Sequence, residues 1–290
     1  MIVLDGATGT ELGRRGVDTR ARLFSAEALL SPGGIALLRD VHADYARAGA
    51  QVITANTFRT NPRKAGEPWR ELTALAVRLA RETGKLVAGS MAPVEDCYRP
   101  DLRPTPRVAL RERREMANAL AEAGCDLLLV ETVAAADEGL AAVQAAVETG
   151  LPVWVAAMVM PDGRMRAGDD PGAFFLGARA LGARAALINC VPRAGVDVGL
   201  DAAAQSGMPF GAYAHMGEVD PEAGWPATPV LSPADYASRV SAWVERGASI
   251  VGGCCGTTPD HIAAIARIWG HVRNPDESSV LCPGIPTEVG

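Results

Sequence analysis

Eight short apolar runs recur along the chain, and each is followed by a helical pattern or a long connection. The runs cover residues 1–4, 51–54, 85–89, 126–131, 152–158, 185–189, 209–213 and 249–252. They consist mostly of valine, isoleucine, leucine and alanine without polar alternation, which is typical of strands buried on both faces of a parallel sheet. Because 290 residues suit eight strand–helix units, the sequence predicts an α/β protein with a single (β/α)8 TIM barrel. A doubly wound open sheet is the alternative, since periodicity alone does not exclude it.

The segments between these runs carry helical signals. Ile35, Leu38 and Val41, for example, fall on one face of a helix, with charged residues on the other face. No Gly/Ser-rich linker divides the chain. The last segment contains three prolines and no periodicity. We therefore expect one barrel over residues 1–273 and an irregular tail over residues 274–290.

Composition excludes two classes of function. The chain has 28 Lys and Arg against 34 Asp and Glu, a net charge of −6, whereas a nucleic-acid-binding face needs a surplus of basic residues. The longest apolar stretch, residues 151–160, is about half the roughly 20 residues that a membrane-spanning helix needs. Residues 1–5 show no secretion signal, so a cytoplasmic location is expected. The charged run 111–115 is interpreted as a solvated, internally paired helix face.

The cysteines carry the strongest chemical signal. Cys254 and Cys255 are adjacent and follow the eighth run among glycines, which permit a tight turn. Cys190 ends the sixth run, from which it could reach the same point near the barrel axis. Three converging thiolates select zinc, and three protein ligands leave the open position of a catalytic site. His215 follows the seventh run and is either a fourth ligand, which would make the zinc structural, or part of the pocket lining.

The other three cysteines need no metal. Cys97, Cys125 and Cys282 are expected to behave as small buried hydrophobes.

Five motifs stand at the ends of the first, second, fourth, sixth and eighth predicted strands. They are Asp5-Gly6-Ala7-Thr8-Gly9-Thr10-Glu11-Leu12, Thr54-Ala55-Asn56-Thr57-Phe58, Leu129-Val130-Glu131-Thr132, Ile188-Asn189-Cys190 and Gly252-Gly253-Cys254-Cys255-Gly256-Thr257-Thr258-Pro259. In order from Asp5 to about Ile268, the chain resembles the homocysteine S-methyltransferase family. That family includes S-methylmethionine-dependent enzymes, betaine–homocysteine methyltransferase and the homocysteine barrel of cobalamin-dependent methionine synthase. The resemblance implies a (β/α)8 barrel and a zinc ion on Cys190, Cys254 and Cys255, with homocysteine sulfur as the fourth ligand.

The implied zinc site makes chemical sense. A free thiol has a pKa of roughly 8.5, so only a few per cent is thiolate at neutral pH. Coordination to zinc removes that proton, and three cysteine thiolates keep the bound sulfur electron-rich. Such a sulfur can attack an activated methyl group in line and displace a neutral thioether. No general base is required.

Given the resemblance, two carboxylates would hold the ammonium end of homocysteine. Glu131 would pair with the α-ammonium; its structural alternative is a rim carboxylate that accepts from backbone amides. Asp5 would assist the ammonium or orient its own loop.

Four further residues would hold the carboxylate end. The amides of Gly6 and Ala7 are exposed by a glycine turn and would bind the carboxylate. Asn56 and Thr57 would donate to the same end, although loop capping explains them nearly as well. The expected partners are thus small molecules, with no nucleic acid and no membrane, and a homo-oligomer stays open.

Three departures from the family pattern leave the methyl donor undecided. Leu187 replaces a glycine, the loop at residues 90–98 lacks the usual Gly-Pro-Tyr-Gly sequence, and residues 214–217 replace an asparagine-containing turn. Because the chain is too short for the further domains of folate or cobalamin enzymes, a sulfonium donor (S-methylmethionine or S-adenosylmethionine) is favoured. The alternatives are betaine or a separate corrinoid protein as donor, another thiol as acceptor, and a non-catalytic zinc barrel closed by His215.

Overall fold

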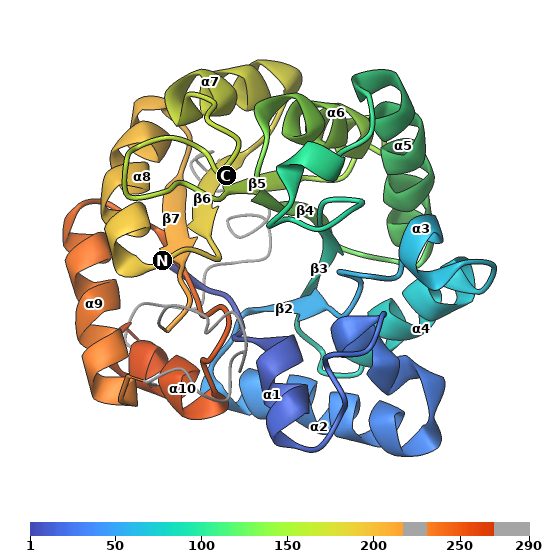
Figure 1. The fold of residues 1–290 in the computed structure, drawn as a ribbon. Helices are drawn as coiled ribbons and strands as arrows, with labels where there is room; N and C mark the ends of the chain where they lie inside the picture. The colour runs from blue at the N-terminus through green and yellow to red at the C-terminus, as the bar shows by residue number, and fades with distance from the viewer. Residues whose placement is uncertain (217–230, 270–290) are drawn as a thin grey trace, which may run out of the picture.

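The structure is a computed structural model that describes residues 1–216 and 231–269. In these residues, eight parallel strands alternate with helices that surround them (Figure 1). The strands are β1 (Ile2–Val3), β2 (Val52–Ala55), β3 (Leu86–Met91), β4 (Leu127–Val133), β5 (Val153–Ala157), β6 (Ala185–Asn189), β7 (Phe210–Tyr213) and β8 (Ile250–Val251). The helices are α1 (Thr8–Arg14), α2 (Pro32–Ala48), α3 (Pro62–Ala65), α4 (Trp69–Arg81), α5 (Pro106–Glu122), α6 (Ala136–Val147), α7 (Pro171–Leu181), α8 (Arg193–Gln205), α9 (Pro233–Glu245) and α10 (Pro259–Trp269), with 3-10 helices η1 (Phe24–Leu30) and η2 (Pro100–Leu102).

The sheet closes on itself between β1 and β2. Its strands are hydrogen-bonded in the order β1-β8-β7-β6-β5-β4-β3-β2. The two end strands meet through a parallel bridge between Leu4 and Val52. The amide of Gln51 donates to the Val3 carbonyl at 2.8 Å, and the amide of Asp5 donates to the Val52 carbonyl at 3.1 Å. An open doubly wound sheet would leave two unpaired edges, so the predicted single barrel is confirmed and the alternative is excluded.

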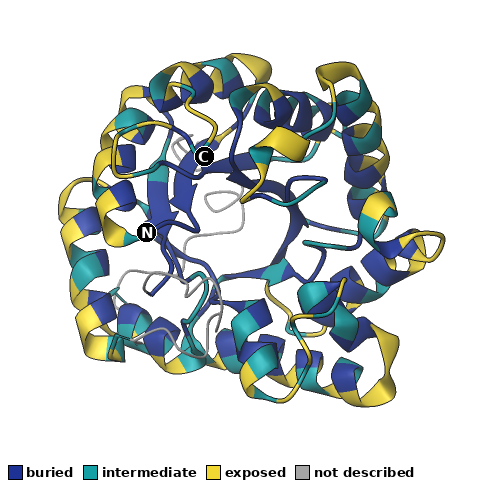
Figure 2. Cartoon of the chain, viewed as in Figure 1, coloured by how far each residue is buried: buried dark blue, intermediate teal, exposed yellow. Residues whose placement is uncertain are grey.

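The strands are buried on both faces, which explains why their sequences do not alternate (Figure 2). One apolar cluster fills the barrel interior, and Trp154 of β5 lies in it with no exposed surface. A second, larger cluster lies between the strands and the surrounding helices. Since both clusters take side chains from each strand, every second residue has an apolar layer on its own side.

Some predictions fall outside the described residues. The proposed tail at 274–290, the domain boundary at 273 and Cys282 all lie there. Among the helices of residues 1–216 and 231–269, none has the length and apolar character needed to cross a membrane.

The interpretation of residues 111–115 as a solvated, internally paired face is wrong for Arg113. This side chain of α5 is only 3% exposed, and its guanidinium lies 2.7 Å from the Glu138 carboxylate on α6. Its neighbour Arg114 is exposed and pairs with Glu148 across the α5–α6 contact at 2.6 Å. One charged residue of a charged run can therefore be buried when a neighbouring helix supplies its counter-ion.

Candidate metal centre and substrate pocket

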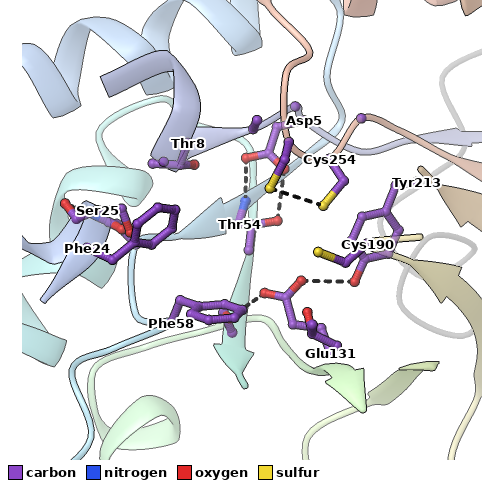
Figure 3. Close-up of a pocket in the computed structure, with 18 of the residues that line it drawn as sticks. Asp5, Thr8, Phe24, Ser25, Thr54, Phe58, Glu131, Cys190, Tyr213 and Cys254 are labelled. Atoms are coloured by element: carbon purple, nitrogen blue, oxygen red, sulfur yellow. Dashed lines mark hydrogen bonds between the residues drawn. The ribbon is translucent and has the colours of Figure 1, made fainter. Parts of the chain in front are cut away.

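The structure brings Cys190, Cys254 and Cys255 together at the carboxyl ends of the strands. Their sulfur atoms all lie within 4.8 Å of one another. Cys190 directly follows β6, whereas Cys254 and Cys255 follow β8, and Figure 3 shows the two stretches facing each other. The Sγ atoms of the adjacent pair are 4.0 Å apart, so the two thiols are not joined in a disulfide. The convergence expected from the sequence is therefore present, while the role of the sulfurs as metal ligands stays a prediction.

The turn after β8 needs its glycines. A Cβ on Gly253 would lie 2.3 Å from the Thr257 Oγ1 atom, and Gly256 has a φ of +87°. The Thr257 hydroxyl donates to the Cys254 carbonyl at 2.7 Å and the Cys254 amide donates to the Ala214 carbonyl at 3.1 Å. These bonds fix the backbone of the cysteine pair. Because only glycine fits beside Thr257 and only glycine adopts such φ values without strain, the local sequence dictates this turn.

Cys190 is held in an unusual backbone conformation by its neighbour. Its φ of +54° lies in the left-handed region, as does the φ of +57° at Thr132 at the end of β4. The Asn189 side chain joins the two strand ends: its Oδ1 accepts from the Thr132 amide, and its Nδ2 donates to the Thr132 hydroxyl, both at 3.0 Å. Backbone strain of this kind persists where surrounding bonds enforce it and is concentrated at functional sites.

A pocket of about 190 Å³ opens beside the sulfurs. It is lined by residues from both halves of the barrel, and Figure 3 shows most of them. The lining residues are Leu4, Asp5, Gly6, Ala7, Thr8, Gly9, Phe24, Ser25, Thr54, Ala55, Asn56, Phe58, Arg59, Ser90, Cys97, Tyr98, Glu131, Thr132, Cys190, Tyr213, Gly253, Cys254 and Cys255. The lining combines the three sulfurs with two buried carboxylates and several aromatic rings.

Glu131 lies in this pocket with its carboxylate surrounded by side-chain donors. The Tyr213 hydroxyl donates to its Oε2 at 3.0 Å, the Asn189 amide donates at 3.4 Å, and the Ser90 hydroxyl donates to Oε1. Burial raises the pKa of Glu131 to about 7, and the bonds from Ser90 and Tyr213 oppose that rise. The backbone-bonded rim carboxylate considered as an alternative does not describe this residue, whose three partners are side chains.

Asp5 is the second buried carboxylate. It accepts from both the amide and the hydroxyl of Thr54 at 2.8 Å. Burial raises its pKa to about 7, the Thr54 bonds oppose the rise, and the nearby Glu131 charge adds to it. Two carboxylates in one buried pocket disfavour each other's charge, and a cation placed between them would relieve both.

Four residues are predicted to donate hydrogen bonds to the substrate carboxylate, and three of them line the pocket. Gly6, Ala7 and Asn56 line the pocket. However, the Ala7 amide donates to the Thr257 hydroxyl at 3.1 Å, and the Asn56 amide group donates to the Ser25 carbonyl at 2.9 Å. Both thus already donate a bond within the protein.

Thr57 is not among the described lining residues. Its hydroxyl donates to the Ser90 carbonyl at 2.9 Å, which supports the alternative that it caps local backbone.

His215 is buried and follows β7. In the described part of the chain, the cluster of potential metal ligands contains the three cysteines and not His215. Cys97 lines the pocket and Cys125 lies in the core near Gly89, both as free buried thiols. The structure also adds residues that the sequence did not single out: Tyr98, from the loop after β3, and Arg59, from the loop after β2, both line the pocket.

The donor set fits a soft divalent cation. Three clustered sulfur atoms, one from buried Cys190 and two from half-buried Cys254 and Cys255, match the ligand preference of zinc, and three protein ligands leave one position for a substrate.

The chain is similar to known homocysteine S-methyltransferases. Residues 2–269 match the family model described as homocysteine S-methyltransferase. The chain is 28% identical to homocysteine S-methyltransferase YbgG of Bacillus subtilis, over 92% of this chain and 93% of that protein. It is 27% identical to selenocysteine methyltransferase of Astragalus bisulcatus, over 96% of this chain and 95% of that protein. It is also 29% identical to methionine synthase of Mycobacterium tuberculosis over 98% of its own length, but spans only 26% of that larger protein.

Solved structures agree with the sequence comparisons. The crystal structure of the metallated form of the homocysteine methyltransferase MmuM from Escherichia coli superposes with a TM-score of 0.78 at 26% identity. The match covers 92% of this chain and 96% of that one. The apo form of the same protein gives a TM-score of 0.71. Since the family model matches residues 2–269, which include all eight strands, the chain belongs to the homocysteine S-methyltransferase family.

Proposed function

We propose that this protein transfers a methyl group from a sulfonium donor to the thiol of L-homocysteine, giving methionine, with zinc on Cys190, Cys254 and Cys255. The observation that carries the proposal is the cluster of three cysteine sulfurs beside a pocket that contains two buried carboxylates. The family and the metallated relative support both the reaction and a bound metal. Zinc is our choice of metal because three thiolates favour it.

The cysteines would create the nucleophile. Zinc bound there would lower the pKa of the incoming thiol and keep its sulfur as a thiolate. The protein would position the metal: Cys190 after β6 and the adjacent pair after β8 converge to within 4.8 Å, and hydrogen bonds fix the turn after β8. A reducing compartment such as the cytoplasm would keep these thiols free, and that location is part of the proposal.

Glu131 and Asp5 would orient homocysteine through its α-ammonium. Burial raises the pKa values of both carboxyl groups to about 7. A bound ammonium stabilises the charged forms and therefore favours both carboxylates as anions. The Gly6 amide and the second N–H of the Asn56 side chain would face the carboxylate end, whereas the Ala7 amide is already bonded to Thr257. Thr57 would support Ser90 and through it Glu131.

The outer part of the pocket supports a cationic methyl donor. Phe24 and Phe58 line it and contact each other edge to face, with ring centroids 6.4 Å apart. Aromatic faces attract sulfonium and other cations. The Arg59 guanidinium lies 5.7 Å from the centre of the Phe24 ring and donates to the Arg22 carbonyl at 3.2 Å; its other N–H groups would bind a donor's carboxylate. A donor that combines a methylsulfonium group with a carboxylate, such as S-methylmethionine, fits this wall best.

Replacing Glu131 by glutamine should weaken homocysteine binding and leave the metal in place. Hydrogen bonds to charged groups contribute about 1.5–3 kcal/mol, so the KM for homocysteine should rise roughly 10- to 150-fold. Steady-state kinetics and a metal analysis of the same preparation would test this. The matched control is Glu122→Gln on the exposed surface of α5, which should change neither quantity. An unchanged KM in Glu131→Gln would remove Glu131 from the ammonium site.

The proposal as a whole is tested by a donor panel. Purified protein would be assayed with homocysteine and S-methylmethionine, S-adenosylmethionine, betaine or methyltetrahydrofolate, next to a zinc determination. We expect about one zinc per chain and turnover with a sulfonium donor. Turnover with betaine, or only when a corrinoid protein is added, would replace the donor that we propose. Stoichiometric zinc without turnover on any donor or thiol acceptor would favour a non-catalytic barrel.

A further inference from the structure

The loop that joins β3 to α5 reaches the metal centre. Its first part, after Met91, is held by a buried ion pair. The Arg113 guanidinium donates to the Ala92 carbonyl and pairs with Glu138 at 2.7 Å, while Glu138 also accepts from the Val94 amide at 3.1 Å. Two charged side chains that are almost fully buried thus fix the backbone at the start of the loop.

The middle of the loop is tied to the neighbouring α3. The Glu95 carboxylate lies 2.8 Å from the Arg63 guanidinium and 2.7 Å from the Lys64 ammonium. The second half then turns toward the pocket, where Cys97 and Tyr98 both line the wall. The loop therefore presents these two side chains from a backbone anchored at several points.

Tyr98 reaches from this loop to a proposed ligand. Its hydroxyl oxygen lies 3.5 Å from the Cys190 sulfur, a hydrogen-bonding distance for sulfur. Tyr98 as a residue is 40% exposed, and the Arg166 guanidinium covers its ring at 4.9 Å from the ring centre. Arg166 also donates to the Tyr98 carbonyl at 3.3 Å, so one arginine holds both the ring and the backbone of this tyrosine.

The direction of the bond follows from its chemistry. A phenol keeps its proton at neutral pH, and a cysteine that ligates a metal has lost its own. The tyrosine must then be the donor and the Cys190 sulfur the acceptor.

We propose that Tyr98 is a positioning residue of the metal centre, whose hydroxyl hydrogen-bonds the Cys190 thiolate and distinguishes it from the reacting sulfur. The inference rests on the proposed function, because it presupposes a metal on the three cysteines. A hydrogen bond draws electron density from the accepting sulfur and lowers its nucleophilicity. The sulfur of the substrate, which does not receive this bond, remains the better nucleophile for the donor's methyl group. Tyr98 thereby directs methylation to homocysteine and away from the protein's own ligand.

Tyr98→Phe tests this directly, because it removes the hydroxyl and keeps the ring under Arg166. Because the hydroxyl also holds the Cys190 sulfur in place, and outer-shell changes typically cost 10- to 100-fold in metal affinity, zinc binding in a chelator competition should weaken by about 10-fold. In the cobalt-substituted protein, the sulfur-to-cobalt charge-transfer band should move to longer wavelength, because the thiolate lone pairs rise in energy. Metal-loaded Tyr98→Phe should also show faster alkylation of Cys190 by iodoacetamide, measured by mass spectrometry of the peptide.

The matched control is Tyr45→Phe. It likewise removes a tyrosine hydroxyl near the barrel mouth, but this one is buried and donates to the carbonyls of Ala7 and Thr257. The cobalt band of this variant should stay at the wild-type position. A band and zinc affinity in Tyr98→Phe equal to those of wild type would overturn the role of Tyr98 while leaving the metal site intact. Failure of the wild-type protein to bind zinc or cobalt at these cysteines would instead overturn the proposed function.

Discussion

Replacing Cys190, Cys254 or Cys255 by serine, one at a time, is expected to remove zinc and to reduce methyl transfer to background. Each change deletes one of three clustered sulfurs, and a neutral hydroxyl is a poor substitute for a thiolate on zinc. Since outer-shell changes alone cost 10- to 100-fold in metal affinity, loss of a direct ligand should cost about 100-fold or more. Zinc per chain by elemental analysis and turnover with the best donor would be measured together.

Cys125→Ala is the appropriate control for those variants. Cys125 is a buried free cysteine that packs near Gly89 and lies outside the sulfur cluster. It should retain full zinc and full turnover, apart from a modest loss of stability. Full activity in any of the three serine variants, with zinc still bound, would show that the cluster is not the metal site.

Removal of the Arg113 side chain is expected to be the most damaging change to stability. Glu138 is only 6% exposed, and Arg113→Met would leave its carboxylate without a counter-ion. Breaking a buried ion pair from one side typically costs 3–5 kcal/mol. The free energy of unfolding, measured in urea, should therefore fall by about that amount.

Two further variants test whether the loss of stability comes from the unpaired buried charge. Arg114→Met affects the next residue of the same helix, whose pair with Glu148 is exposed on the surface, and should cost less than about 1 kcal/mol. The double variant Arg113→Met with Glu138→Gln removes the buried charge but keeps an oxygen acceptor for the Val94 amide. It should recover part of the stability that Arg113→Met loses. Equal losses for Arg113→Met and Arg114→Met would contradict our account of the buried pair.

The strands and their order were predictable because barrel geometry ties them to simple sequence features. Apolar runs of the right length recur eight times, and the observed strands begin and end close to them, as with the run at 185–189 and β6. The meeting of Cys190 with the pair after β8 was predictable for the same reason. In a parallel barrel, all carboxyl ends lie on one rim, so residues there approach each other whatever their separation in sequence.

Contacts made by loops were not predictable from spacing. Tyr98 reaches Cys190 from a loop that is held by ion pairs with other elements, and no periodicity encodes the path of such a loop. Thr57 stands at a strand end as expected, yet its hydroxyl bonds to Ser90, since side-chain direction in the turn after a strand depends on local dihedrals. The charged neighbours of Arg113 predict that it faces solvent, whereas its partner Glu138 comes from a different helix.

The position of the three sulfurs along the chain has a consequence for biosynthesis. Cys190 emerges from the ribosome well before Cys254 and Cys255, and the turn that carries the later pair is hydrogen-bonded to Asp5 near the amino terminus. A nascent polypeptide therefore lacks the complete cysteine cluster until its eighth strand has been synthesised and has docked beside the first. Binding of a metal ion by all three proposed ligands would be a late event, and it would occur only in molecules in which the two ends of the barrel have met.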